Sequence, residues 1–318
     1  MSWRRAGRAL AGRTVQLRPS ERLTMSWRRA GWALAVGVFL MGGVAASAQP
    51  ARDPEVDAAL ERIQASVERF YARALSVLAD VRVRVLPLGR DMSPRGRTRE
   101  LLYEMRVEWA EATDGAVPEP VVARTLLLAD GRPPEAGDEP ECGDPGALSE
   151  EPLAVFLPAR RKDYVFSWHG RANEAGRETV VLDYRMRDDA APTIEWDDTC
   201  VSVDLAGKTR GRVWADAVSG DVLRVDERMV GIFEFRVPPE HNLGGAPLTM
   251  AIERADNSVR YRPVEFSDPD ETLLLPSTIE LMTEWRNAGV DRQLIVHEIS
   301  NYRRFITGSR LLSPPGRP

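Results

Sequence analysis

The chain has 318 residues, enough for one large all-β domain or two small ones. Residues 1–48 hold eight Arg and one Glu of its 43 basic and 48 acidic residues, so the remainder carries 35 basic and 47 acidic residues, a net charge of −12. A chain this acidic is a poor candidate for binding nucleic acid or anionic lipid head groups through bulk charge.

The N-terminus contains an exact repeat. Met1–Gly7 reads Met-Ser-Trp-Arg-Arg-Ala-Gly, and Met25–Gly31 repeats it. A repeat of this kind rarely has a structural purpose. We therefore interpret Met25 as the true start and residues 1–24 as upstream sequence.

Residues 25–48 have the pattern of a secretory signal peptide. Arg28 and Arg29 supply the positive end, Trp32–Val44 supplies a short apolar core, and Ala46–Ala48 supplies small residues at a cleavage site. The alternative, a membrane anchor, is disfavoured because the apolar run is shorter than the roughly 20 residues that span a bilayer. The pattern predicts a periplasmic or secreted protein, cleaved near Ala48 and without a transmembrane segment in its mature chain.

The first predicted element of the mature chain is a long amphipathic helix over about Pro54–Leu78. Asp53 can cap it, and Pro54 suits its first position. Apolar residues recur at spacings of three and four: Val56, Leu60, Ile63, Val67, Phe70, Ala74 and Val77. Because its polar face mixes both charge signs, we expect packing on a sheet rather than on a membrane surface.

From residue 80 onward the hydrophobic period changes to two, which is typical of strands with one solvated face. The alternating sets are Val81, Val83 and Val85; Leu101, Tyr103, Met105, Val107 and Trp109; Val122 to Leu128; Tyr164, Phe166 and Trp168; Val180, Leu182, Tyr184 and Met186; Phe233, Phe235 and Val237; Leu248, Met250 and Ile252; Ile279, Leu281, Thr283 and Trp285; and Ile295, His297 and Ile299. With the hairpin below, they make ten or eleven strands.

Arg210–Met229 is the clearest β-hairpin, with a polar break at Asp216–Asp221 between its two arms. In the second arm Leu223 and Val225 alternate with charged residues, but Glu227 falls on their apolar side. A bulge or an edge position would explain this departure from the pattern.

These elements predict a mainly β (α+β) protein. It is a single domain over residues 49–312, in which a large curved antiparallel sheet or half-open β-barrel is covered by the long N-terminal helix. A curved sheet with incomplete closure leaves an apolar cavity between helix and strands.

The remaining segments are predicted to be loops. Asp130–Pro152, rich in Pro, Gly and acidic residues, is expected to be a surface loop or lid, Gly170–Gly176 a turn, and residues 313–318 a disordered tail. The two cysteines, Cys142 and Cys200, lie in polar, loop-like surroundings. In an oxidising compartment they are expected to form one disulfide.

Motifs for catalysis or cofactor binding are not found, so we predict no enzyme activity, cofactor or metal. His169, His241 and His297 lie far apart in the sequence; we expect His169 in a turn and His297 as a satisfied core or interface histidine. Asp268, Asp270 and Glu271 are conceivable calcium ligands, but a solvated turn is favoured because the spaced ligands of a calcium loop are missing.

Aromatic and Met side chains on apolar strand faces are the best candidates for a ligand cavity. Individually each is most simply a core residue, but together they can line a cavity for an acyl chain. The candidates are Met105, Trp109, Phe166, Trp168, Phe233, Met250 and Trp285.

The order of a signal peptide, an amphipathic helix and a meander of alternating strands resembles the LolA/LolB/RseB superfamily of periplasmic lipoprotein carriers and sensors. The segments that carry the resemblance are Leu126–Arg132, Gly211–Asp216 with Gly220, Leu273–Ser277 and Ser300–Phe305. It implies a half-open β-barrel that is covered by helices and holds acyl chains. This chain departs from the family in its greater length, its Asp130–Pro152 segment and its cysteine pair.

Two functions follow from this pattern. The first is a non-enzymatic envelope protein that binds a lipid or lipoprotein acyl chain in the concave face of the sheet. The second is a periplasmic scaffold or sensor subunit that binds another envelope protein through the surface or edge of its sheet. An exported hydrolase is disfavoured. A cluster of Ser, His and an acid in a cleft would be evidence for it.

Overall fold

A computed structural model of the chain describes residues 53–73, 76–109, 120–139, 151–187, 191–197, 200–241, 249–267, 270–288 and 292–304. The predicted upstream sequence, the signal peptide with its cleavage site and the C-terminal tail lie outside these residues. So do Cys142 and Asp268. The predicted disulfide and the predicted solvated turn at Asp268–Glu271 therefore stay predictions.

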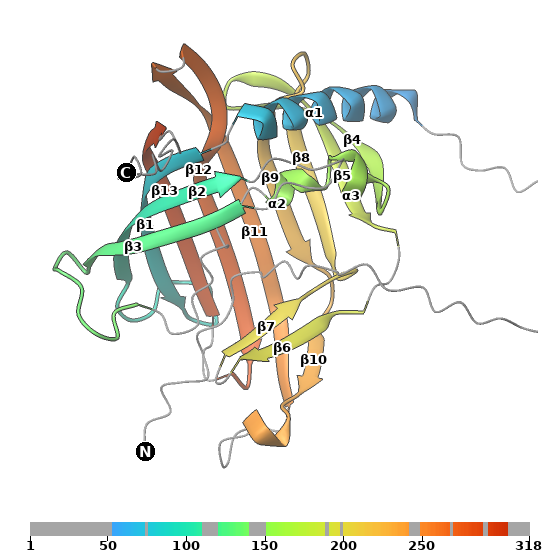
Figure 1. The fold of residues 1–318 in the computed structure, drawn as a ribbon. Helices are drawn as coiled ribbons and strands as arrows, with labels where there is room; N and C mark the ends of the chain where they lie inside the picture. The colour runs from blue at the N-terminus through green and yellow to red at the C-terminus, as the bar shows by residue number, and fades with distance from the viewer. Residues whose placement is uncertain are drawn as a thin grey trace, which may run out of the picture.

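An open antiparallel sheet of eleven strands dominates the fold (Figure 1). Its order is β3-β2-β1-β13-β12-β11-β9-β8-β5-β4, with β10 paired to β11. The strands are β1 (Ser76–Leu88), β2 (Arg99–Trp109), β3 (Pro120–Ala129), β4 (Tyr164–Glu174), β5 (Arg177–Met186), β8 (Thr209–Asp216), β9 (Val222–Met229), β10 (Phe233–Arg236), β11 (Thr249–Ser267), β12 (Asp270–Arg286) and β13 (Arg292–Arg304). The sheet does not close, because β3 and β4 stay at its two edges. The predicted fold class is confirmed.

Two predicted details of the strands are wrong. The turn predicted at Gly170–Gly176 is confined to Ala175 and Gly176, because β4 continues to Glu174 and β5 begins at Arg177. His169 therefore lies inside β4, at an irregularity in the pairing between Trp168 and Gly170. Period-two alternation is interrupted at such an irregularity, which explains why the sequence pattern suggested a strand end.

A small second sheet was not predicted. It pairs β6 (Thr193–Asp197) with β7 (Cys200–Asp204). Cys200 therefore begins a strand rather than lying in a loop. Each strand has only five residues, so its alternation is too short to recognise from the sequence.

Helix α1 (Pro54–Arg73) crosses the sheet and contacts β4, β9 and β12. The carboxylate of Asp53 accepts a hydrogen bond from the Glu55 N–H at 3.0 Å, as expected for an N-cap. Its buried stripe consists of Val56, Ala59, Leu60, Ile63, Val67, Phe70 and Tyr71. The helix is shorter than predicted. It ends at Arg73, whose carbonyl accepts a hydrogen bond from Arg304 at 2.8 Å, and Val77 belongs to β1. We call the face of the sheet that carries α1 the inner face.

The turn of the β8–β9 hairpin holds α1 in place. Gly220 has a φ of +76° and lies so close to Arg62 that a Cβ would overlap the helix backbone. Ser66 of the helix donates a hydrogen bond to Asp221 at 2.7 Å. The hairpin predicted from the sequence is therefore present, and it also positions the helix.

Two short helices follow, α2 (Glu151–Ala154) and α3 (Pro158–Arg161). Pro152, the predicted end of the loop, thus lies in a helix. Between them the side chain of Phe156 is fully buried, with its ring centroid 5.9 Å from those of Phe166 and Tyr184. This segment fills the inner face beside α1.

The buried apolar residues form two clusters. The larger joins α1, the Phe156 segment and the middle of the sheet. The smaller lies where β6 and β7 pack on the other end of the long strands: Val201, Val203, Phe235, Val237, Met250, Ile252, Trp285 and Ala288. In the described part of the chain, no helix has the length and apolarity needed to cross a bilayer.

Candidate functional site

A single row of directly paired residues crosses the inner face at the border of the two clusters. We call it the border row. It follows the strand pairing through nine strands, from β4 to β2: Phe166, Tyr184, Gly211, Glu227, Asn257, Leu281, Ile295, Val85 and Arg99.

Burial distinguishes the border row from the row beside it. The neighbouring row on the α1 side is almost completely buried, from Leu182 through Val225 to Leu101. In the border row, by contrast, Phe166, Leu281, Ile295 and Val85 are only partly buried. The border row therefore leaves apolar side chains partly exposed on the inner face of the open sheet.

Tyr184, Gly211 and Glu227 form a fitted unit within the border row. The Tyr184 ring occupies the space above Gly211, where any Cβ would overlap the ring. Its hydroxyl donates a hydrogen bond to Glu227 Oε1 at 2.9 Å. Gly211 is thus required for the close approach of the Tyr184 ring. The Tyr184 hydroxyl reaches across β8 to the Glu227 carboxyl on β9.

The position of Glu227 corrects one prediction. The carboxyl does lie on the apolar side, as the pattern indicated, but neither an edge nor a bulge is the cause. β9 is an interior strand between β8 and β11, and its pairing irregularity lies before Val225. Simple alternation from Val225 places Glu227 on the inner face, where Tyr184 provides its hydrogen bond.

Burial controls the ionisation of this unit. Desolvation raises the pKa of Glu227, and the hydrogen bond from Tyr184 only partly offsets that effect. The pKa of Tyr184 lies well above its usual value because of burial and the nearby Glu227 carboxyl. Tyr164, next to this pair, also has a raised pKa, caused by burial and then by Glu227.

Asn257 lies directly opposite Glu227 in the ladder between β11 and β9. Its Oδ1 atom is buried and has no hydrogen-bond partner among the described residues. A buried acceptor without a donor is costly, and it is uncommon in folded proteins. Two acceptors, the Glu227 carboxyl and the Asn257 amide oxygen, therefore belong to directly paired residues of the border row.

The β2 end of the border row contacts residues 130–139, the first described part of the predicted lid. Arg99, the last residue of the row, donates to the Asp138 carbonyl. Asp138 in turn accepts two hydrogen bonds from Arg132, at 2.8 and 3.0 Å. The Arg99 contact therefore joins the segment to β2, while the contacts between Arg132 and Asp138 stabilise the segment itself.

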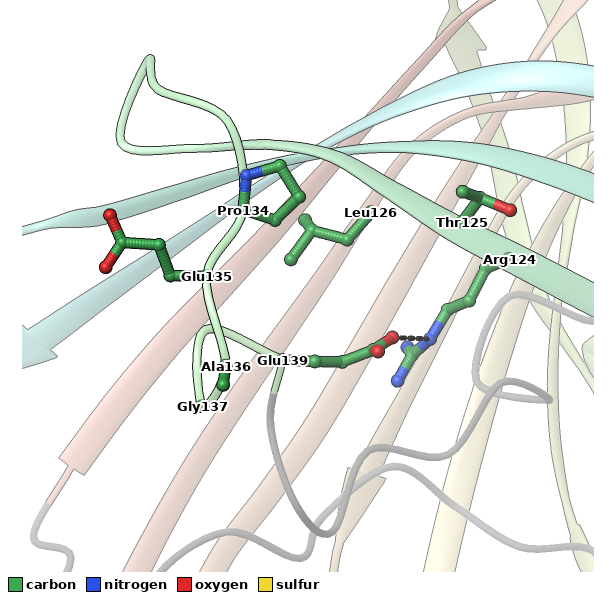
Figure 2. A pocket seen from close by; sticks show the side chains of 8 residues that line it. All are labelled: Arg124, Thr125, Leu126, Pro134, Glu135, Ala136, Gly137 and Glu139. Atoms are coloured by element: carbon green, nitrogen blue, oxygen red, sulfur yellow. Dashed lines mark ion pairs between the residues drawn. The ribbon is translucent and has the colours of Figure 1, made fainter.

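A pocket of about 430 Å³ lies between this segment and strand β3 (Figure 2). Its lining residues are Arg124, Thr125, Leu126, Pro134, Glu135, Ala136, Gly137 and Glu139. The Arg124 guanidinium lies 3.7 Å from the Glu139 carboxylate and 5.1 Å from the ring centre of Tyr103. The arginine is thus engaged by an acid and an aromatic ring, and the pocket is polar on the loop side.

His297 lies in the buried row beside the border row, paired with Ile279 and Val83. It is 7% exposed, as expected for a core histidine. However, its Nδ1 atom has no partner among the described residues, so the prediction of a satisfied histidine is wrong. Burial, with a smaller contribution from the charge of Arg124, lowers its pKa to about 4.

The seven predicted cavity residues fall into two groups. Met105, Phe166 and Trp168 belong to the larger cluster, and Phe166 alone among them lies in the border row. Phe233, Met250 and Trp285 belong to the smaller cluster. Trp109 ends β2, and its side chain lies outside the description. Their contact with a ligand stays a prediction.

One combination of Ser, His and an acid lies on β4 and β5, but it does not form a hydrolase triad. His169 Nδ1 lies 2.9 Å from Asp183, whose second oxygen accepts a 2.6 Å hydrogen bond from Arg212. Ser167 pairs with Asp183 in the ladder. These residues lie on the exposed outer face, and no described hydrogen bond joins Ser167 to His169. In the described ranges, no group of three or more His, Cys, Asp or Glu is arranged to hold a metal.

Sequence reasoning missed most of the border row because Leu281, Ile295 and Val85 look like any core residues. One signal was available, namely Glu227 on an apolar strand face. Asn257 gave no signal, because the irregular pairing between Ile252 and Arg254 shifts the alternation of β11.

Comparison of the sequence with protein-family models finds no match, and comparison with curated proteins also finds none. Comparison with solved structures finds similar chains at low identity. A domain described as an outer membrane lipoprotein-sorting protein of Vibrio parahaemolyticus matches with 11% identity and a TM-score of 0.40, over 80% of this chain and 95% of that one. A LolA superfamily protein of Nitrosomonas europaea matches with 10% identity and a TM-score of 0.31, over 78% and 94%. MucB in the MucA/MucB complex of Pseudomonas aeruginosa matches with 14% identity and a TM-score of 0.21, over 78% and 99%. The superfamily that the sequence pattern resembles is thus among the structural matches.

Proposed function

We propose that this chain is an exported, non-enzymatic envelope protein that binds the acyl chain of a lipid or lipoprotein along the border row of its inner face. The observation that carries this proposal is the partial exposure of the apolar border-row residues Val85, Ile295 and Leu281. Covering such surface stabilises a complex by about 25 cal/mol per Å². The predicted signal peptide supports a location in the periplasm or outside the cell.

The dimensions of the apolar part of the border row favour a hydrocarbon chain. Strands are spaced about 4.8 Å apart, so the apolar stretch from Leu281 to Val85 extends roughly 10 Å along the border row. The row is one side chain wide and is bordered by a buried row on one side and by the smaller cluster on the other. An α-helix, at about 10 Å in diameter, needs a wider surface.

The test is native mass spectrometry of protein expressed with its signal peptide and purified from the periplasm. We expect a lipid adduct near one per chain that leaves on mild extraction and returns when an acyl probe is added. The same spectrum reports the cleavage site and the disulfide. A lipid-free mass, with no uptake of acyl probes, would contradict the proposal.

Two substitutions on β13 test whether the acyl probe binds at the border row. Ile295→Glu places a carboxylate among the apolar border-row side chains and is expected to abolish uptake of the probe. Val296→Glu, its neighbour on the outer face of β13, is the matched control and is expected to retain uptake. Equal uptake by both variants would place the lipid elsewhere.

A second candidate is a scaffold or sensor subunit that binds another envelope protein. It is favoured by edge strand β3, whose exposed side includes Val121, 66% exposed, together with Leu127 and Leu128. An unpaired edge with apolar side chains is suited to strand addition by a partner. A lipid-free protein with an intact fold would favour this candidate.

A further inference from the structure

The polar pair in the border row points to the head group of the ligand. Resting on the acyl-chain function proposed above, we propose that Glu227 and Asn257 bind the primary ammonium group of an amine-bearing phospholipid, whose acyl chain then follows the border row. In this proposal Glu227 and Asn257 accept hydrogen bonds from the N–H groups of the ligand's ammonium.

The arrangement of acceptors is the first argument. Glu227 and Asn257 are directly opposed on adjacent strands, where Cβ atoms are typically about 5 Å apart. Tyr184 occupies Oε1 of the carboxyl at 2.9 Å, while Asn257 Oδ1 lacks a donor within the described residues. A primary ammonium has three N–H donors and no acceptor, so it can donate to both the Glu227 carboxyl and the Asn257 amide oxygen.

The charge around the carboxyl is the second argument. Its neighbours in the border row, from Tyr184 and Gly211 to Leu281, are all uncharged. The influences on the ionisation of Glu227 are its burial and the Tyr184 hydrogen bond, and a cation of the described chain is not one of them. A buried carboxylate without a counter-ion is unfavourable, and a ligand cation would supply the missing charge.

The path of the acyl chain is the third argument. Beyond Asn257 the border row continues through Leu281, Ile295 and Val85, which are uncharged and only partly buried. This path extends roughly 14 Å, the distance of three strand spacings. The ethyl, phosphate and glycerol units separate the ammonium from the acyl chain, so an ammonium at Glu227 places the start of the acyl chain toward the Val85 end of this path.

The test compares two lipids that differ in their N–H donors. Dioleoyl phosphatidylethanolamine has a primary ammonium, while dioleoyl phosphatidylcholine has a quaternary one that cannot donate a hydrogen bond. Both are offered in equal amounts to the delipidated full chain, and loading is measured by native mass spectrometry. A charged hydrogen bond contributes about 1.5–3 kcal/mol, so we expect a preference for the ethanolamine lipid of roughly ten- to a hundredfold.

Three variants test whether Glu227 and Asn257 cause the preference for the ethanolamine lipid. Glu227→Gln keeps the shape and the acceptor for Tyr184 but removes the charge, and it is expected to reduce the preference to about one. Asn257→Leu removes the second acceptor and is expected to reduce it several-fold, which provides an independent check if the first variant folds poorly. Glu280→Gln, an exposed glutamate on the outer face of β12, is the matched control and should keep the full preference.

The outcomes separate this proposal from the function on which it rests. Equal loading of both lipids by the unmodified protein, or a preference that survives Glu227→Gln, overturns the ammonium site and leaves acyl binding in place. Loading of neither lipid overturns both.

Discussion

Tyr184 lies directly over Gly211, the residue paired with it on the neighbouring strand, and its hydroxyl reaches Glu227 one strand further. The missing side chain at residue 211 is therefore what allows a buried phenol and a buried carboxyl to meet. Three strands are coupled through one side chain, so changes at any of the three residues are expected to affect the others.

Gly211→Ala should destabilise the protein, because the added methyl group overlaps the Tyr184 ring. Overpacking of this kind costs about 1–3 kcal/mol. Urea unfolding measures the loss in the free energy of unfolding. In a Tyr184→Ala background the same change should cost much less, and a cost that is equal in both backgrounds would show that the ring is not the cause.

Gly220→Ala should loosen the contact between the β8–β9 turn and helix α1. The residue has both a positive φ of +76° and no room for a Cβ against Arg62. Gly231→Ala is the matched control, because its φ is +77° and nothing lies within 4 Å of the added Cβ. Both variants experience backbone strain of about 1 kcal/mol. The expected result is a clearly lower thermal midpoint for Gly220→Ala than for Gly231→Ala; equal midpoints would contradict the packing role.

Phe156→Ala should create a cavity between the α2–α3 segment and the aromatic side chains of β4 and β5. Phe156 is fully buried and contacts Phe166 and Tyr184. Loss of a buried Phe costs about 3–5 kcal/mol. Phe156→Leu, which keeps most of the volume, should cost less. A loss below about 1 kcal/mol for the alanine variant, measured by urea unfolding, would mean that the segment does not stabilise the fold.

His297 should make the stability pH-dependent in weakly acidic solution. Its pKa is about 4 in the folded protein and about 6.5 when exposed. Between these values the unfolded chain binds a proton that the folded chain does not, so the free energy of unfolding falls as the pH decreases from 6.5 to 4. The shift corresponds to roughly 3 kcal/mol.

The measurement is urea unfolding at several pH values for the unmodified protein and for His297→Leu, which should lose this pH dependence. Ile279→Val, a neighbouring core change without a titrating group, should lower the stability by a similar amount at every pH. A slope that persists in His297→Leu would assign the effect to other groups.

Glu227 should change the pH dependence of the free energy of unfolding in the direction opposite to His297. Because its pKa is raised in the folded protein, the folded chain retains a proton that the unfolded chain releases above the usual carboxyl pKa of about 4.3. The stability associated with this group is therefore present at low pH and is lost as the pH rises through the folded pKa. Glu227→Gln should gain stability relative to the unmodified protein as the pH increases above that value, and parallel stability curves would contradict this expectation.

Local patterns were sufficient to predict the elements of the fold. The 3.6-residue period of Val56 to Phe70 predicted the helix, and the two-residue period of Tyr103 and Val107 predicted strands with one buried face. The polar break at Asp216–Asp221 predicted the hairpin, in which Asp216 now accepts hydrogen bonds from the N–H groups of Val218 and Ser219 at 2.9 and 2.7 Å. These features depend on neighbours within a few residues, so a sequence contains them directly.

The border row is a property of the tertiary structure. Its members come from nine strands between residues 85 and 295, and only the register of each pairing places them in line. Register depends on packing and on irregularities such as the one after Ile252, which a hydrophobic pattern does not reveal. The sequence marked Glu227 as a carboxylate on an apolar face, but it was the pairing of β9 with β8 and β11 that brought Tyr184 and Asn257 beside it, because contacts between strands distant in the chain form only when the whole sheet assembles.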